Sequence, residues 1–92
     1  MEYKIRITTA FKKDLKKMRL QNFNLVELEK VINTLATGKK LDAKYRNHIL
    51  SGDYDNCYEC HIKPDWLLIY KIQENELLLI LIRTGSHSNL FK

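Results

Sequence analysis

The sequence predicts an α+β domain in which two N-terminal helices pack on one face of a mainly antiparallel sheet of four to five strands. Three observations support this prediction. The first 38 residues hold one alternating segment and then two segments of helical periodicity. From residue 48 onward, short apolar segments are separated by turn residues. No helical pattern recurs there, so the helices must cover one face of a sheet built from consecutive hairpins.

The first predicted strand covers residues 3–7. Its apolar members, Tyr3, Ile5 and Ile7, alternate with charged residues. This period-two pattern is typical of a strand that buries one face, so we expect these three side chains to be buried.

A strongly basic helix is predicted next. Thr8 or Thr9 can cap its N-terminus, because a threonine hydroxyl accepts a hydrogen bond from a free backbone N–H group. Phe11, Leu15 and Met18 recur at helical spacing and form the apolar stripe. The other faces carry five cations, namely Lys12, Lys13, Lys16, Lys17 and Arg19.

A second amphipathic helix is predicted between a cap at Asn22 or Asn24 and a stop at Gly38. Its apolar stripe consists of Leu25, Leu28, Ile32 and Leu35. The helical period ends after Gly38, and residues 39–46 have the composition of a polar loop.

Four further strands are predicted in the second half, at residues 48–50, 56–62, 66–72 and 76–83. Pro64 has no backbone N–H group and cannot sit inside a central ladder, so it places a turn between the second and third of these strands. Residues 73–75 form a further hairpin turn. The tail from residue 84 has small residues and no clear period.

The length and composition describe one domain that spans residues 1–92. No apolar run approaches the roughly 20 residues that cross a bilayer. The N-terminus has an acid at position 2 and no apolar segment before a small-residue cleavage site, so it lacks the pattern of a secretory signal. We therefore expect a cytoplasmic protein that does not associate with a membrane.

The positive charge is concentrated in the first half of the chain. Residues 1–46 contain 12 Lys and Arg against 5 Asp and Glu, whereas residues 47–92 contain 4 against 6. A basic half attracts polyanions through its long-range field and through counterion release, which points to RNA, DNA or an acidic protein as partner. A solvated basic helix without a partner is the alternative interpretation.

Cys57 and Cys60 have the spacing of a redox pair or half a zinc site. They fall in a predicted strand, where residues three apart face opposite sides, so one metal ion could not easily hold both. We expect buried thiols and no metal site. Glycine-rich phosphate loops, the Gly-x-Ser-x-Gly elbow and the zinc-protease helix motif are absent from the sequence, so no cofactor is predicted.

Two short segments could carry proton-transfer chemistry. His61 and Asp65 flank a turn, which could bring an imidazole and a carboxylate to one rim of the sheet. Arg83 and His87 bracket a segment that contains Gly85, where arginine could hold phosphate oxygens while histidine donates a proton. The alternatives are an aspartate that bonds only the turn backbone and an ordinary basic strand end.

Three stretches of the second half resemble the YafQ branch of the RelE superfamily of bacterial type II toxins. They are residues 45–54, 59–71 and 83–91. The most specific feature is the combination of His61-Ile62-Lys63-Pro64-Asp65-Trp66 with Arg83-Thr84-Gly85-Ser86-His87. The two-helix first half agrees with the family's layout, so the resemblance implies a single RelE-like domain.

The resemblance implies a ribosome-dependent endoribonuclease that cleaves messenger RNA in the decoding site and halts translation without a metal ion. It further implies a cognate antitoxin that holds the toxin inactive, and contact with operator DNA only through the antitoxin complex. The partners expected for this chain are thus that antitoxin, messenger RNA and the ribosome.

By the same resemblance, the catalytic residues are His48, His61, Asp65 and His87. The substrate-binding residues are expected to be Arg83, Trp66, Phe91, Arg46 and Lys63. A base would take the proton of the ribose 2′-hydroxyl and an acid would protonate the departing 5′-oxygen. We assign the acid to His87, leave the base open between Asp65, His61 and His48, and expect these groups to gather around one phosphodiester beside Arg83.

Two positions depart from the family pattern. Many relatives have Asp-His-Pro where this chain has Asn47-His48-Ile49, and an arginine often stands where this chain has Tyr58. The second departure leaves Arg83 as the clearest phosphate ligand. Three other functions compete with the nuclease: a toxin of this fold that binds a protein such as gyrase, a catalytically weak relative of the family, and a DNA-binding domain that uses the first helix.

Overall fold

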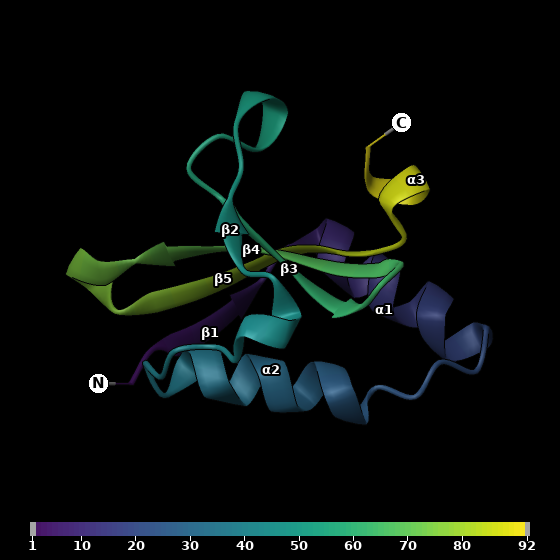
Figure 1. The fold of residues 1–92 in the computed structure, drawn as a ribbon, viewed down its shortest axis with the longest axis horizontal. Helices are drawn as coiled ribbons and strands as arrows, with labels where there is room; N and C mark the ends of the chain where they lie inside the picture. The colour runs from purple at the N-terminus through teal and green to yellow at the C-terminus, as the bar shows by residue number, and fades with distance from the viewer. Residues whose placement is uncertain (1, 92) are drawn as a thin grey trace.

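A computed structural model describes residues 2–91 of the chain (Figure 1). Its strands are β1 (Lys4–Ile7), β2 (His48–Ile49), β3 (Tyr58–Lys63), β4 (Trp66–Gln73) and β5 (Leu78–Gly85). Its α-helices are α1 (Thr9–Leu20), α2 (Val26–Ala36) and α3 (His87–Leu90), and its 3₁₀ turns are η1 (Ala43–Tyr45), η2 (Gly52–Tyr54) and η3 (Glu74–Glu76).

The strands form one mixed sheet in the order β1-β5-β4-β3-β2. β2, β3, β4 and β5 pair with one another antiparallel, because short turns connect β3 to β4 and β4 to β5. β1 pairs parallel with β5. The predicted α+β architecture with a mainly antiparallel sheet is therefore confirmed.

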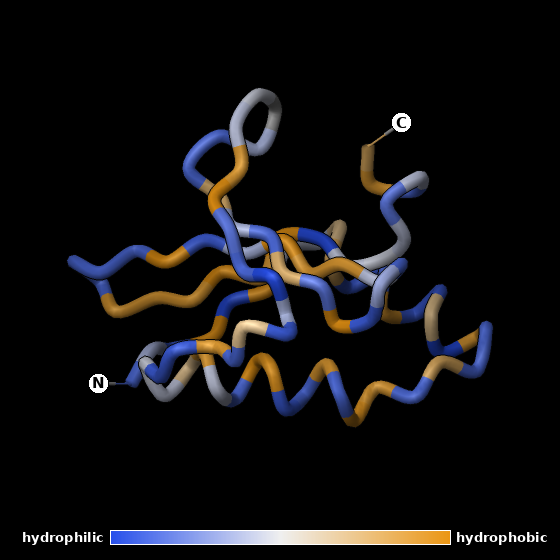
Figure 2. Tube along the Cα trace, viewed as in Figure 1, coloured by the Kyte–Doolittle hydropathy of each residue, from blue (hydrophilic) through white to orange (hydrophobic). Residues whose placement is uncertain are grey.

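The main core lies between the sheet and the two long helices. Phe11 and Met18 of α1 are buried in this core, as predicted from their helical spacing. β3, β4 and β5 contribute alternate residues to this side, and Figure 2 shows β5 as a nearly continuous apolar stretch. The members from α2, β4 and β5 are Leu28, Val31, Leu35, Trp66, Leu68, Tyr70, Leu79 and Leu81.

The predicted burial of β1 is only partly correct. Ile5 and Ile7 are paired in register with the core residues Leu79 and Leu81, yet they are 47% and 42% exposed. β1 is an edge strand and has a neighbour on one side only, so its apolar face is covered incompletely. Tyr3 is half-buried.

Helix α1 covers the part of β5 that β1 does not reach. The Thr8 hydroxyl accepts the Phe11 N–H at 3.0 Å, which confirms one of the two predicted caps, and it donates to the carbonyl of Ile82 at 2.7 Å. Farther along, the carboxylate of Asp14 accepts the backbone N–H of Thr84 at 3.0 Å. These bonds tie α1 to the C-terminal half of β5.

Helix boundaries follow local side-chain chemistry. α2 begins at Val26, whose N–H donates to Oδ1 of Asn24, and Gly38 has a φ of +75° just beyond its end. α3 was not predicted; Ser86 caps it by accepting the N–H of Asn89. Within residues 2–91, no helix is long and apolar enough to cross a membrane.

Cys57 and Cys60 are both free and buried, and they belong to opposite sides of the sheet, as predicted. Cys60 lies in the main core, and burial raises the pKa of its thiol to about 12. Cys57 packs in a smaller cluster on the other side, where burial also raises its pKa. Neither thiol is poised for chemistry.

Candidate active site

Two imidazoles meet one buried carboxylate on the sheet. His48 of β2 is paired in register with Glu59 of β3, and His61 lies two residues farther along β3 on the same face. Oε1 of Glu59 is 3.4 Å from Nε2 of His48 and 3.3 Å from Nε2 of His61. The two imidazole ring centroids are 6.3 Å apart.

This group faces away from the long helices because of the strand alternation. Cys60 and Ile62 of β3 point into the main core. Glu59 precedes Cys60 and His61 lies between Cys60 and Ile62, so both point to the other side of the sheet. Figure 1 shows the loop that carries η2 and the C-terminal α3 rising on the side of the sheet away from α2. Only 5% of Glu59 is exposed, so its charge is largely shielded from water.

The orientation of His48 is set by its neighbours. Its Nδ1 lies 2.8 Å from the carbonyl oxygen of Arg46, which can only accept, and its Nε2 faces Glu59. Both ring nitrogens thus face acceptor oxygens, which fix the orientation of the ring. The adjacent Asn47 accepts the hydroxyl of the buried Tyr70 at 2.6 Å, which holds this segment against the core.

Arg83 is held by an acidic residue of α1. Its Nε donates to Asp14 at 2.7 Å and its Nη2 at 3.0 Å, a two-pronged pair in which the arginine side chain is 28% exposed and that of Asp14 13%. The hydrogen bond with Asp14 raises the pKa of Arg83, and Tyr54 adds to the effect. The guanidinium is therefore fixed and charged at any physiological pH.

A series of aromatic contacts runs from Tyr54, which interacts with Arg83, to Phe91 and His87 near the C-terminus. The rings of His87 and Phe91 lie 4.7 Å apart, and Phe91 contacts Tyr54 edge-on at 5.6 Å. His87 is exposed and Phe91 is 37% exposed, so both present ring surface to solvent. Part of the Phe91 ring is therefore accessible to a ligand.

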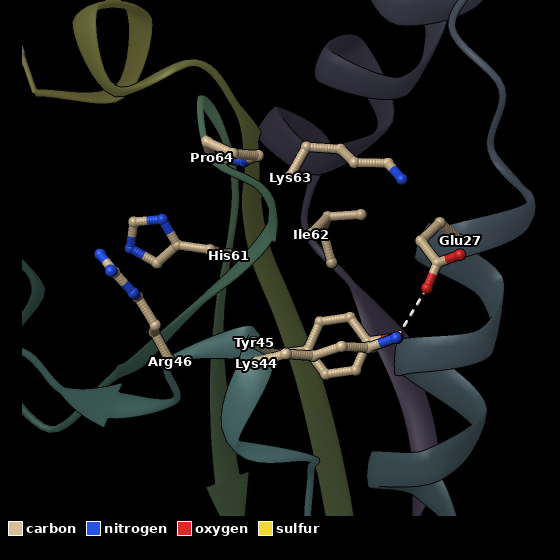
Figure 3. Close-up of a pocket in the computed structure, with 8 residues that line it drawn as sticks. All are labelled: Glu27, Lys44, Tyr45, Arg46, His61, Ile62, Lys63 and Pro64. Atoms are coloured by element: carbon tan, nitrogen blue, oxygen red, sulfur yellow. Dashed lines mark hydrogen bonds between the residues drawn. The ribbon is translucent and has the colours of Figure 1, made fainter.

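Two cavities flank these groups. The first has a volume of about 440 Å³ and includes His61, Arg46 and Lys63 in its lining (Figure 3). The second has a volume of about 260 Å³ and includes Asp65 and Arg83. The substrate-binding residues predicted as Arg46, Lys63 and Arg83 therefore all line a cavity.

The prediction that His61 lies beside the carboxylate of Asp65 is wrong. The carboxylate beside His61 is Glu59, and Asp65 lies on the exposed turn and lines the cavity of Arg83 instead. A bulge between His61 and Lys63 shifts the register of the hairpin, so the two sides of the turn do not face each other as in a regular ladder.

Trp66 occupies the core side of the sheet. It is 4% exposed, its indole N–H donates to Oγ1 of Thr84 at 2.9 Å, and its ring contacts Phe23 edge-on. A ring so enclosed has little surface with which to stack on a base, although Trp66 contributes to the lining of the cavity that contains Arg83.

The expected single cluster is divided into two groups. His48, Glu59 and His61 form the first, and Arg83 with His87 and Phe91 belongs to the second. Among the described residues, none of the hydrogen bonds, ion pairs or ring contacts joins them. A reaction that uses both groups therefore needs a substrate that contacts each of them.

Glu59 and Asp14 were not predicted as site residues. Glu59 could have been found from period two, because it lies two positions before His61 in a strand and must share its face. Asp14 offered no signal, since its contact with Arg83 spans 69 positions. Across residues 2–91, no set of three or more His, Cys, Asp or Glu side chains is arranged to hold a metal ion.

The chain is similar to known proteins over nearly its whole length. Residues 3–92 match the model of a family described as the bacterial toxin of type II toxin-antitoxin system, YafQ. The chain is 32% identical to the mRNA interferase toxin YafQ of Escherichia coli K12 over 88 residues, which cover 95% of this chain and 94% of that one.

Solved structures have the same fold over the whole chain. A metal-bound toxin from Helicobacter pylori is 45% identical, with a TM-score of 0.90 over 99% of this chain and 100% of that one. YafQ in the E. coli DinJ-YafQ toxin-antitoxin complex is 30% identical, with a TM-score of 0.89 over 100% of both chains. The chain therefore belongs to the YafQ family of bacterial type II toxins.

Proposed function

We propose that this chain is an endoribonuclease that cleaves messenger RNA in the ribosomal decoding site, by metal-free attack of a ribose 2′-hydroxyl, and so inhibits translation. The family assignment and the relatives named mRNA interferase support the overall activity. The observation that carries the chemistry is the Glu59 carboxylate, which lies within 3.4 Å of two imidazoles on the face of the sheet away from the long helices.

The reaction requires one base and one acid. The base removes the proton from the 2′-hydroxyl, the 2′-oxygen forms a bond to the adjacent phosphorus, and the bond from phosphorus to the 5′-oxygen breaks. The acid gives a proton to that departing oxygen, which leaves a 2′,3′-cyclic phosphate and a 5′-hydroxyl. Imidazoles suit both steps, because they exchange protons near neutral pH.

His61 is the base that the geometry supports best. It is 22% exposed, so substrate can reach it, while Glu59 behind it can orient the ring and stabilise the positive charge that it gains. His48 faces the same Glu59 carboxylate, so this carboxylate interacts with both imidazole rings. Asp65 has no imidazole beside it among the described contacts and faces the other cavity, where it can contact RNA.

His87 is the acid in this proposal, and Arg83 stabilises the charge of the phosphate in the transition state. Asp14 occupies Nε and one position of Nη2, so other N–H groups of the Arg83 guanidinium can bind a phosphate oxygen. Phe91, packed against His87, can stack on a base of the RNA and so align the chain with the acid.

The partners follow from the same assignment. A cognate antitoxin binds the chain and inhibits it, as the E. coli toxin-antitoxin complex suggests, and operator DNA is contacted only through that complex. Messenger RNA and the ribosome are the targets of the free toxin. Because translation takes place there, the cytoplasm is the compartment of action.

A cleavage assay on programmed ribosomes tests this proposal. Purified protein is incubated with ribosomes and message, and primer extension locates the cut. We expect a cut in the decoding site that His87→Ala and His61→Ala abolish, while both variants keep the wild-type unfolding midpoint. An intact message with stalled replication in the cell would instead indicate a protein target such as gyrase.

A further inference from the structure

The cavity beside His61 has features that the cleavage chemistry does not use. Glu27 of α2 and Lys44 and Tyr45 of η1 line it together with the end of β3 (Figure 3). Its volume of about 440 Å³ lies within the range of small-ligand sites. Because His61 belongs to its lining, whatever enters this cavity lies directly next to the proposed base.

The cavity is rich in cations. Lys44, Arg46 and Lys63 line it, and none of the three takes part in an ion pair among residues 2–91. Figure 3 shows Arg46 extending beside His61, whereas Lys63 extends toward Glu27. The cavity thus has one cation beside the proposed base and others near Glu27, an arrangement that attracts the phosphates of a single strand.

One carboxylate stands among these cations. Oε2 of Glu27 accepts the hydroxyl of Tyr45 at 2.6 Å, and this bond raises the pKa of Tyr45 to about 12 and lowers the pKa of Glu27. The carboxylate is therefore ionised and held in place. Its other oxygen, Oε1, forms no hydrogen bond among the described residues and can accept one from a ligand.

We infer that this cavity binds the RNA nucleotide next to the cleaved bond. Lys44 and Lys63 hold its phosphate, and Oε1 of Glu27 accepts a hydrogen bond from its base. A carboxylate selects a base with an exocyclic amino group and disfavours uracil, whose single N–H is flanked by carbonyl oxygens. The cavity would thus contribute to sequence preference, an inference that rests on the proposed nuclease function.

Binding of uncleavable RNA tests the phosphate contacts. Trinucleotides with 2′-O-methyl groups cannot be cut by 2′-hydroxyl attack, and fluorescence anisotropy measures their affinity at several salt concentrations. For Lys44→Gln/Lys63→Gln we expect about tenfold weaker binding and a salt slope reduced by about 0.7, the value for one phosphate contact on a single strand. The matched control is Lys12→Gln/Lys16→Gln, which removes two exposed lysines of α1 that line neither cavity.

Base preference tests the role of Glu27. Wild-type protein should bind a trinucleotide with adenine, cytosine or guanine at one position about tenfold more tightly than the same sequence with uracil there, and Glu27→Gln should lose this preference. Tyr45→Phe keeps the carboxylate and should retain it. The inference is overturned if the control pair weakens binding as much as Lys44→Gln/Lys63→Gln, or if Glu27→Gln leaves the preference unchanged.

The two proposals fail separately in these experiments. Wild-type protein that cuts message on the ribosome but shows neither effect in the trinucleotide assay keeps its nuclease function and loses the subsite. Protein that shows both effects but cuts no message keeps the subsite as a binding site and loses the proposed reaction.

Discussion

Replacing Asp14 with asparagine should destabilise the domain by about 2 to 4 kcal/mol. Asp14 accepts two hydrogen bonds from Arg83 and one from the backbone N–H of Thr84. Asparagine has one acceptor oxygen, and its amide N–H groups would face the donors of Arg83. A hydrogen bond to a charged group contributes about 1.5 to 3 kcal/mol, and we take a total near the value of one or two such bonds because Arg83 is 28% exposed and screened.

Urea unfolding followed by the emission of Trp66 measures this change. Trp66 is the single tryptophan, it is buried, and its indole N–H is bonded to Thr84, whose backbone Asp14 holds. The control Glu29→Gln removes an exposed carboxylate of α2 and should shift the free energy of unfolding by less than about 0.5 kcal/mol. A change in the free energy of unfolding of less than about 0.5 kcal/mol for Asp14→Asn would refute the view that Asp14 holds Arg83 and the C-terminal half of β5 in place.

Three further predictions concern catalysis, metal and pH. Glu59→Gln should lower the cleavage rate constant about ten- to a hundredfold, measured at a temperature where the variant is folded, because one charge-assisted hydrogen bond is worth about 1.5 to 3 kcal/mol; a wild-type rate would exclude a role for this carboxylate. Saturating EDTA, applied to the toxin before magnesium-dependent ribosomes are added, should leave cleavage unchanged if the reaction needs no bound metal, whereas lost activity restored by a transition metal would contradict the mechanism. The Tyr45–Glu27 hydrogen bond raises the pKa of Tyr45 to about 12, so its stabilisation is present below pH 10 and is lost as the pH rises toward 12. Thermal melts should therefore show a smaller loss of stability between pH 9 and 12 for Tyr45→Phe than for wild type, and parallel losses would show that this bond does not contribute.

Elements with a complete local pattern could be predicted from the sequence. Phe11 and Met18 lie at helical spacing, so their burial followed from the amphipathic stripe, and Pro64 located the β3–β4 turn because it cannot serve a ladder. α3 has only four residues, too few for a period to emerge. Its cap Ser86 was the one local signal available.

Features that depend on strand order could not be read in the same way. The alternation of Ile5 and Ile7 predicted a buried face, but only the sheet order reveals that β1 is an edge strand. The contacts of the candidate active site also depend on how distant segments pair and pack. His48 and Glu59 meet because β2 pairs with β3 in one register, and Arg83 meets Asp14 because α1 lies along β5.

The chemical identity of the RNA ends after cleavage is the most direct test of the central claim. Message cut on the ribosome by the wild-type protein is analysed by mass spectrometry of the fragments on both sides of the cut. Attack by the 2′-hydroxyl leaves a 2′,3′-cyclic phosphate on one fragment and a 5′-hydroxyl on the other, and His87→Ala should yield neither. A 3′-hydroxyl with a 5′-phosphate would mean that water attacks the phosphorus, which would contradict the mechanism assigned to His61, Glu59 and His87.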